Sequence, residues 1–180
     1  MKSDAVKPPA LLFLIGYRGT GKSTVARLLA KQLGWEFADT DELVEQNAGR
    51  SISQIFAQDG EAGFRNLEAA VLNELSSRRN CVIATGGGIV IRPANRELLR
   101  TSGRVVWLTA DAQTIWGRLQ QDADSGQRRP TLTVGGLAEV EQLLRVREPL
   151  YGECSTWIVD TAVRSPQAVA ESVRRRLTEH

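Results

Sequence analysis

Short runs of apolar residues alternate along this chain with longer segments whose apolar positions recur every three or four residues. The longer segments predict helices. The runs contain few polar positions, as expected of strands covered on both faces. They lie at 11–15, 35–38, 81–84, 104–108 and 156–160. This alternation predicts one α/β domain, a single three-layer unit with a five-stranded parallel sheet and helices on both faces.

Capping residues set the expected ends of several helices. A helix follows the first strand to Leu33, with Gly34 as its C-terminal cap, and Ser51 with Gln54 forms the pattern of a capping box. Pro149 is expected to end a helix that begins near residue 137. Three further helices are predicted over 43–47, 61–78 and 93 to about 101. Two more are predicted from their first residues, one capped by Asp111 and one opened by Ser165 and Pro166.

The stretch from Gly16 to Ser23 has the spacing GxxxxGK[ST] and lies between a predicted strand and a predicted helix. Backbone N–H groups in such a loop cradle phosphate oxygens, and the helix N-terminus adds partial positive charge. A chance glycine-rich turn is the alternative, but the context on both sides favours a P-loop that binds ATP. We expect Lys22 to reach the β- and γ-phosphates and Ser23 to bind Mg²⁺. The other expected ATP-binding positions here are Gly19, Thr20, Gly21 and Thr24.

Two further groups of residues follow predicted strands. Asp39 and Asp41 come at the end of the second strand, and Gly86, Gly87 and Gly88 come after the third. Carboxyl ends of parallel strands line the ligand crevice of an open α/β sheet, so both groups are expected beside the P-loop. The glycines fit either a tight turn or a close approach of backbone to a ligand, and their position favours the second.

Arginines supply the remaining candidate chemistry. Residues 120–134 are polar, carry Arg128 and Arg129, and predict a mobile lid that closes over the phosphates. Arg65 and Arg147 are either solvated surface residues or a clamp for a carboxylate. For Arg147, stabilisation of a helix C-terminus is a further alternative.

Composition narrows the class of protein. The chain has 180 residues, 42% of them hydrophobic, and a net charge of +2, which gives no reason to expect a nucleic-acid partner. Two cysteines, Cys81 and Cys154, indicate no disulfide framework and favour the cytoplasm. No segment is long enough to span a membrane. Residues 1–10 are expected to be a flexible lead-in to one domain over 11–180, which we expect to be a monomer, and the one histidine, His180, is terminal.

The chain resembles the shikimate kinase family over about residues 11–177. The resemblance rests on several motifs in order, not on the P-loop alone. They are DxD at 39–41, FRxxE at 64–68, the triple glycine at 86–88, an Arg-Pro pair at 129–130 and RxPLY at 147–151. The stretch from Arg118 to Arg129 is longer than in compact members of the family.

This resemblance implies a P-loop kinase fold and phosphorylation of the 3-hydroxyl of shikimate by ATP and Mg²⁺, a step of aromatic amino acid biosynthesis. Lys22, Asp41 and Arg129 would be catalytic, and Ser23 and Asp39 would form the Mg²⁺ site. Asp41 would also bind the shikimate hydroxyls, and Arg65, oriented by Glu68, would bind the carboxylate with Arg147. The remaining implied contacts are Gly86, Gly87 and Gly88 with shikimate, Arg129 with phosphate, and Arg118, Arg164 and Pro166 with adenine.

Two other functions compete with this prediction. A kinase of the same fold with another acceptor, such as gluconate or a nucleotide, would keep the P-loop but change the acceptor residues. A regulatory module that only binds nucleotide would be expected to have lost Asp41, Arg65 or Arg129, and all three are present.

Overall fold

The computed structural model describes residues 11–122 and 135–178. The predicted N-terminal lead-in, most of the predicted lid with Arg128 and Arg129, and His180 lie outside the described residues. No helix in the described ranges is long and apolar enough to cross a membrane.

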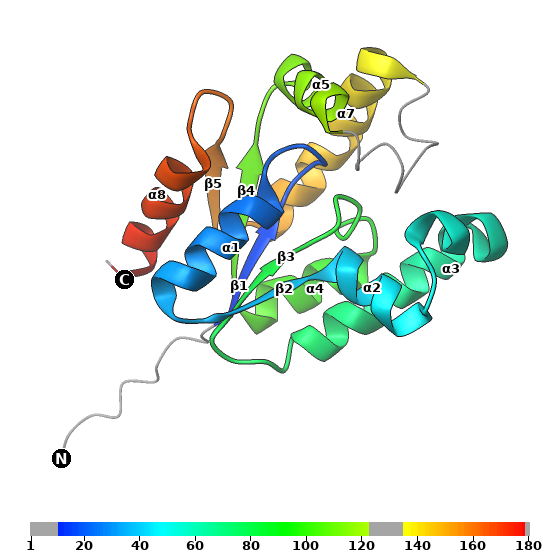
Figure 1. The fold of residues 1–180 in the computed structure, drawn as a ribbon, viewed down its shortest axis with the longest axis horizontal. Helices are drawn as coiled ribbons and strands as arrows, with labels where there is room; N and C mark the ends of the chain where they lie inside the picture. Colours follow the sequence, from blue (N-terminus) through cyan, green and yellow to red (C-terminus); the bar gives the residue numbers. More distant parts are fainter. Residues whose placement is uncertain (1–10, 123–134, 179–180) are drawn as a thin grey trace.

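Five parallel strands form a single sheet in the order β2-β3-β1-β4-β5 (Figure 1). Their bounds are β1 Leu11–Ile15, β2 Glu36–Asp39, β3 Cys81–Ala84, β4 Arg104–Thr109 and β5 Trp157–Asp160. β1 lies in the centre and pairs with β3 on one side and β4 on the other. The predicted fold class and all five predicted strands are confirmed, with ends that shift by one residue in β2, β4 and β5.

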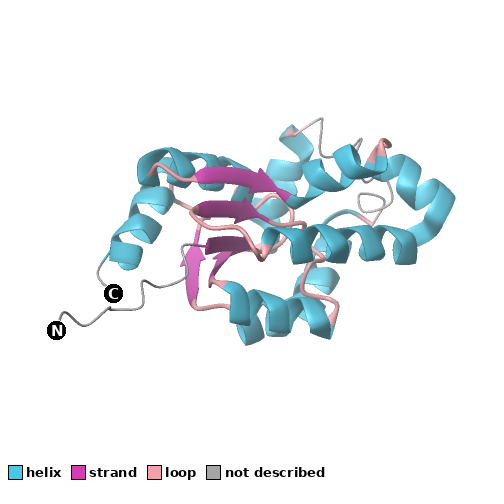
Figure 2. Cartoon of the chain, turned by 90° about the horizontal axis from the view of Figure 1, so that it is seen from below, coloured by secondary structure: helices cyan, strands magenta, loops and turns pink. Residues whose placement is uncertain are grey.

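Alternation along β1 divides the core into two layers. Phe13 faces one layer with residues of α3, α4 and α7, and Leu14 faces the other with residues of α1 and α8. Figure 2 shows the sheet between these helices. The helices are α1 Lys22–Leu33, α2 Thr40–Ala48, α3 Ile52–Leu75, α4 Pro93–Ser102, α5 Ala112–Gln121, α7 Gly136–Cys154 and α8 Pro166–Thr178.

The predicted caps form as expected. Gly34 ends α1 in the left-handed conformation, and Ser51 and Gln54 exchange both hydrogen bonds of a capping box. Asp111 accepts from the Thr114 N–H at the start of α5, and Ser165 accepts from the Ala168 N–H at the start of α8. These ends were predictable because each depends on contacts within a few residues.

Two predicted helix boundaries are wrong. α7 does not end before Pro149 but continues through it to Cys154. Proline removes one backbone hydrogen bond, and burial of Tyr151 and Cys154 against the core compensates for that loss. α2 begins at Thr40 rather than Leu43, because the Asp39 side chain accepts from the N–H groups of Asp41 and Glu42 and caps the helix.

A third difference concerns α3. The sequence predicts two helices, and the backbone at Gly60, with φ 69° and ψ −174°, does interrupt the helical path between them. The second part ends at Leu75 rather than at residue 78. This second part carries Arg65 and Glu68 on its buried face.

Candidate active site

The loop between β1 and α1 lies at the carboxyl end of the central strand. Gly16 has a φ of 139°, and a Cβ there would lie 2.3 Å from the carbonyl oxygen of Leu108 at the end of β4. The chain can therefore make this close turn only with glycine. The turn places the N-terminus of α1 at the carboxyl edge of the sheet, and backbone N–H groups at a helix N-terminus are suited to binding an anion.

Side chains of the loop also hold its shape. The hydroxyl of Thr20 and the ammonium of Lys22 each donate to the Tyr17 carbonyl oxygen, at 2.8 Å. Lys22 is buried, with 8% of its surface exposed. The loop thus holds a desolvated positive charge in place, which strengthens its attraction for phosphate.

Ser23 and Asp39 are brought together from α1 and the end of β2. The Ser23 hydroxyl donates to Asp39 Oδ2 at 2.7 Å, while Asp39 Oδ1 accepts from the Asp41 N–H at 2.9 Å. A hydroxyl and a carboxylate oxygen are hard ligands that suit Mg²⁺. No group of three or more His, Cys, Asp or Glu side chains suited to a metal occurs in the described ranges.

A cleft of about 340 Å³ joins these groups to the glycine turn after β3. It confirms that the P-loop, the aspartates and the glycine turn share one edge of the sheet. Its lining comprises Arg18, Gly19, Gly21, Lys22, Ser23, Thr24, Asp39, Asp41, Thr85, Gly86, Gly87, Arg118, Leu119 and Asp122. Arg18, Thr85, Leu119 and Asp122 were not among the predicted site residues.

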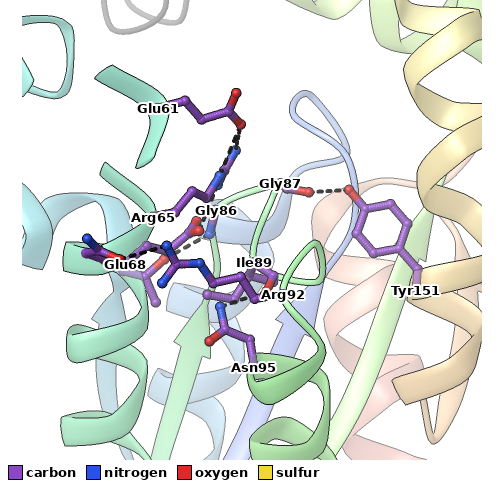
Figure 3. Close-up of polar contacts among 11 residues, drawn as sticks. Glu61, Arg65, Glu68, Gly86, Gly87, Ile89, Arg92, Asn95 and Tyr151 are labelled. Atoms are coloured by element: carbon purple, nitrogen blue, oxygen red, sulfur yellow. Dashed lines mark hydrogen bonds and ion pairs between the residues drawn. The ribbon is translucent and has the colours of Figure 1, made fainter. Parts of the chain in front are cut away.

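Arg65 is a buried side chain and not a solvated surface arginine. It is 6% exposed and donates to the buried carboxylate of Glu68 at 2.7 Å, with a longer contact of 3.3 Å to Glu61 (Figure 3). A Cβ on Gly88 would lie within 2.3–2.5 Å of the Arg65 guanidinium atoms. The guanidinium thus lies directly against the glycine turn, and glycine at position 88 leaves the space for it.

Arg147 is buried in the middle of α7, with 8% of its surface exposed. The alternative of a cation at a helix C-terminus is therefore wrong, because seven residues of α7 follow it. Its guanidinium carbon lies 5.7 Å from the centre of the Tyr17 ring in the P-loop. The buried guanidinium of Arg147 is thus in contact with the P-loop.

The glycine turn after β3 is held by side chains from α2, α4 and α7. The Gly86 N–H donates to the Thr40 hydroxyl at 2.8 Å, and the Tyr151 hydroxyl donates to the Gly87 carbonyl (Figure 3). Asn95 of α4 donates to the Ile89 carbonyl at 3.0 Å. Thr40, Tyr151 and Asn95 were missed in the sequence. Thr40 and Tyr151 act on backbone that is distant along the chain, and no motif marks the contact of Asn95 with Ile89.

Arg118 and the predicted adenine segment have different environments. Arg118 donates to the carbonyl oxygens of Gly19 at 3.2 Å and Thr161 at 2.7 Å, so it ties the P-loop to the end of β5. Arg164 and Pro166 are exposed and do not line the cleft. Arg129 lies outside the described residues, so its predicted role stays a prediction.

The fold and the site define a class of protein, a P-loop phosphotransferase. A phosphate-binding loop and an oxygen-ligand pair face a cleft whose other wall carries Asp41 and a glycine turn, and two buried arginines lie beside that turn and the P-loop. Transfer of a phosphoryl group to a small acceptor requires such a two-sided arrangement.

Comparison with known proteins identifies the family. The model of the family described as shikimate kinase matches residues 18–178. A shikimate kinase of Rhodopirellula baltica is 44% identical over 96% of this chain and 92% of its own length, and one of Burkholderia lata is 40% identical over 97% and 93%. This chain therefore belongs to the shikimate kinase family and is a kinase.

Solved structures agree with this assignment. A shikimate kinase from Acinetobacter baumannii in complex with shikimate superposes with a TM-score of 0.90 at 37% identity, covering 96% of this chain and 94% of that one. A gluconokinase from Sinorhizobium meliloti has a TM-score of 0.60 at 19% identity, over 95% and 93% of the two chains. The second likeness reflects the shared fold alone.

Proposed function

We propose that this protein transfers the γ-phosphoryl group of ATP to the 3-hydroxyl of shikimate, giving shikimate 3-phosphate and ADP, in the biosynthesis of aromatic amino acids. The observation that carries the proposal is the pairing of a P-loop with a buried arginine, Arg65, beside a glycine turn. Membership of the shikimate kinase family supports the same reaction.

On the donor side, the P-loop backbone and Lys22 bind the phosphates of ATP. Lys22 stabilises negative charge on the transferring group, because its ammonium lies in a desolvated position at the floor of the cleft. Ser23 and Asp39 would hold Mg²⁺, which would supply positive charge to offset that of the phosphates. Arg118 supports the P-loop through Gly19 and borders the space for the nucleotide.

On the acceptor side, Asp41 binds the shikimate hydroxyls and accepts the proton of the reacting one. Asp41 lies in the first turn of α2, where its neighbour Asp39 caps the helix, so its position is fixed by the backbone. Arg65 and Arg147 bind the carboxylate, and Gly86, Gly87 and Gly88 let backbone approach the ring. Arginine suits the carboxylate because its planar fork matches the two oxygens.

Arg129 is proposed to complete the phosphate site, and Arg164 and Pro166 to contact adenine. These assignments rest on the family motif and on the position of the 161–166 segment next to Arg118, which bonds to Thr161. We also infer a cytoplasmic monomer. Two free, buried cysteines support a reducing compartment.

An ADP-release assay with Mg-ATP and a panel of acceptors tests the proposed function. We expect turnover with shikimate and little with gluconate or nucleoside monophosphates. Turnover with gluconate and none with shikimate would assign the protein to a different acceptor. ATP binding without acceptor-dependent ADP release would instead leave only a nucleotide-binding role.

A second assay separates a carboxylate clamp from surface charge. Arg65→Ala and Arg147→Ala should each raise the KM for shikimate far more than the KM for ATP. Arg100 on α4 is an exposed arginine whose ion pair with Glu97 is long, at 3.7 Å, so Arg100→Ala is the matched control. Equal effects of the three substitutions would reject the clamp.

A further inference from the structure

The triple glycine follows β3, lies against Arg65 and shares a cleft with Asp41. Thr40 lies between Asp39 and Asp41 and accepts the Gly86 N–H at 2.8 Å. The Gly86 carbonyl accepts from the Ile89 N–H at 3.1 Å, so a backbone hydrogen bond spans the turn from its first glycine to the residue after its last. A turn built from three glycines has much conformational freedom, and such freedom must be removed by specific contacts if the backbone is to present fixed donors.

Tyr151 supplies the contact at the other side of the turn. Its hydroxyl donates to the Gly87 carbonyl, and the side chain is completely buried. Its ring packs against Trp107 of β4, with 5.6 Å between the ring centres. The hydroxyl is therefore held in place by the core of the protein and not by the turn that it contacts.

A fixed carbonyl also fixes the next N–H. The Gly87 carbonyl and the Gly88 N–H belong to one planar peptide unit and point in opposite directions. Because Tyr151 holds the carbonyl, the Gly88 N–H points away from α7. Figure 3 shows Gly87 between Tyr151 on one side and Arg65 on the other.

The same side chain connects the two clamp arginines. Tyr151 follows Arg147 by one helical turn of α7, and residues four apart share a helix face. Burial raises the pKa of the Tyr151 hydroxyl, and the charges of Arg147 and Arg65 act in the opposite direction. The hydroxyl thus lies within reach of both positive charges and stays protonated as a donor.

We propose that Tyr151 is a positioning residue for the acceptor, which fixes the Gly87–Gly88 peptide between Arg65 and Arg147 so that backbone and guanidinium groups bind one substrate together. This inference rests on the proposed function. It concerns how the acceptor half of the site is ordered before substrate arrives. The cost of ordering a glycine turn is met during folding, so substrate binding does not bear it.

Tyr151→Phe tests the proposal, because it removes only the hydroxyl and keeps the ring against Trp107. We expect the KM for shikimate to rise roughly tenfold, the KM for ATP to stay within about twofold, and kcat to change little. Direct titration of shikimate in the absence of ATP should show the same loss of affinity.

Thr156→Val is the matched control. The Thr156 hydroxyl accepts from the Val105 N–H at 3.1 Å, at the opposite end of the sheet from the cleft. Its removal should lower the melting temperature without changing the KM for shikimate. A Tyr151→Phe variant that behaves in the same way, less stable but with an unchanged KM for shikimate, would overturn the proposal.

Thr40→Val tests the turn from its other side if Tyr151→Phe does not fold. It removes the acceptor of the Gly86 N–H, and the same selective rise in the KM for shikimate is expected. An unchanged KM in a folded Thr40→Val variant would then overturn the proposal. Failure of the proposed function is distinct, because the unsubstituted protein would then release no ADP with shikimate.

Discussion

The hydroxyl of Ser23 and the carboxylate of Asp39 are joined by a hydrogen bond of 2.7 Å, although they lie 16 residues apart. The bond connects the first turn of the P-loop helix to the end of β2. Asp39 uses its other oxygen to cap α2, which carries Asp41. One carboxylate therefore sets the distance between the proposed metal site and the proposed acceptor site.

Asp39→Asn should weaken the binding of Mg²⁺ selectively. Asparagine caps helices as well as aspartate does, so α2 should keep its start and the melting temperature should change little. Loss of the charge should raise the Mg²⁺ concentration for half-maximal rate by about tenfold or more. Titration of Mg²⁺ at saturating ATP and shikimate measures this. An unchanged Mg²⁺ requirement would show that Asp39 serves only as a cap.

Glu68→Gln should weaken the binding of shikimate. Glu68 is fully buried and holds Arg65, so loss of its charge leaves that guanidinium without its close counter-ion. We expect a KM for shikimate raised by about tenfold and a loss of up to about 3–5 kcal/mol in the free energy of unfolding. Steady-state kinetics and urea unfolding measure the two effects.

Glu61→Gln is the control for this pair. Glu61 contacts the same guanidinium at 3.3 Å, but 63% of its side chain is exposed. An exposed ion pair contributes about 0–1 kcal/mol, so the KM and the stability should change little. If both substitutions raise the KM equally, burial of Glu68 is not what holds Arg65.

Lys22→Ala should reduce kcat on the order of a hundredfold or more, because it removes a charge that stabilises the transferring phosphoryl group. The fold should remain, since the ammonium donates to a backbone carbonyl of its own loop, that of Tyr17. Lys31→Ala, at an exposed position in the last turn of α1, should leave turnover unchanged. Near-normal turnover by the Lys22 variant would be incompatible with the P-loop assignment.

Gly88→Ala should displace Arg65, because the new Cβ would overlap its guanidinium at 2.3–2.5 Å. We expect a higher KM for shikimate with an unchanged KM for ATP. Gly117→Ala in α5 is the matched substitution, since nothing lies within 4 Å of a Cβ there, and it should stabilise the helix by about 0.5–1 kcal/mol. Equal losses of shikimate affinity in both variants would exclude a specific effect at position 88.

Cys81 and Cys154 should resist alkylation in the folded protein. Burial raises the pKa of both thiols, that of Cys154 from 9.0 to about 11, so the reactive thiolate is scarce at pH 8. A thiol pKa that is higher in the folded protein also makes stability fall as the pH rises from about 9 toward 11. Iodoacetamide labelling with and without urea, read by mass, checks accessibility, and labelling of native protein would contradict it.

Patterns among residues close together in the sequence were sufficient to predict most of the secondary structure. Five buried strands, the capping box at Ser51 and the proline at the start of α4 all depend on residues close together in the chain. The largest exception is α7, which passes through Pro149. Its path is determined by burial of Tyr151 under β4, a contact that no local pattern contains.

The sequence by itself determined that this chain binds phosphate and belongs among P-loop kinases, because a phosphate loop is a continuous motif with a fixed backbone geometry. It also placed Asp41, Arg65, Gly87 and Arg147 in order along the chain. Only the tertiary structure decided whether the two arginines were buried, what held them and what ordered the glycine turn. Those answers depend on hydrogen bonds between distant segments, from Thr40 to Gly86 and from Tyr151 to Gly87, and these form only when the sheet brings the segments together.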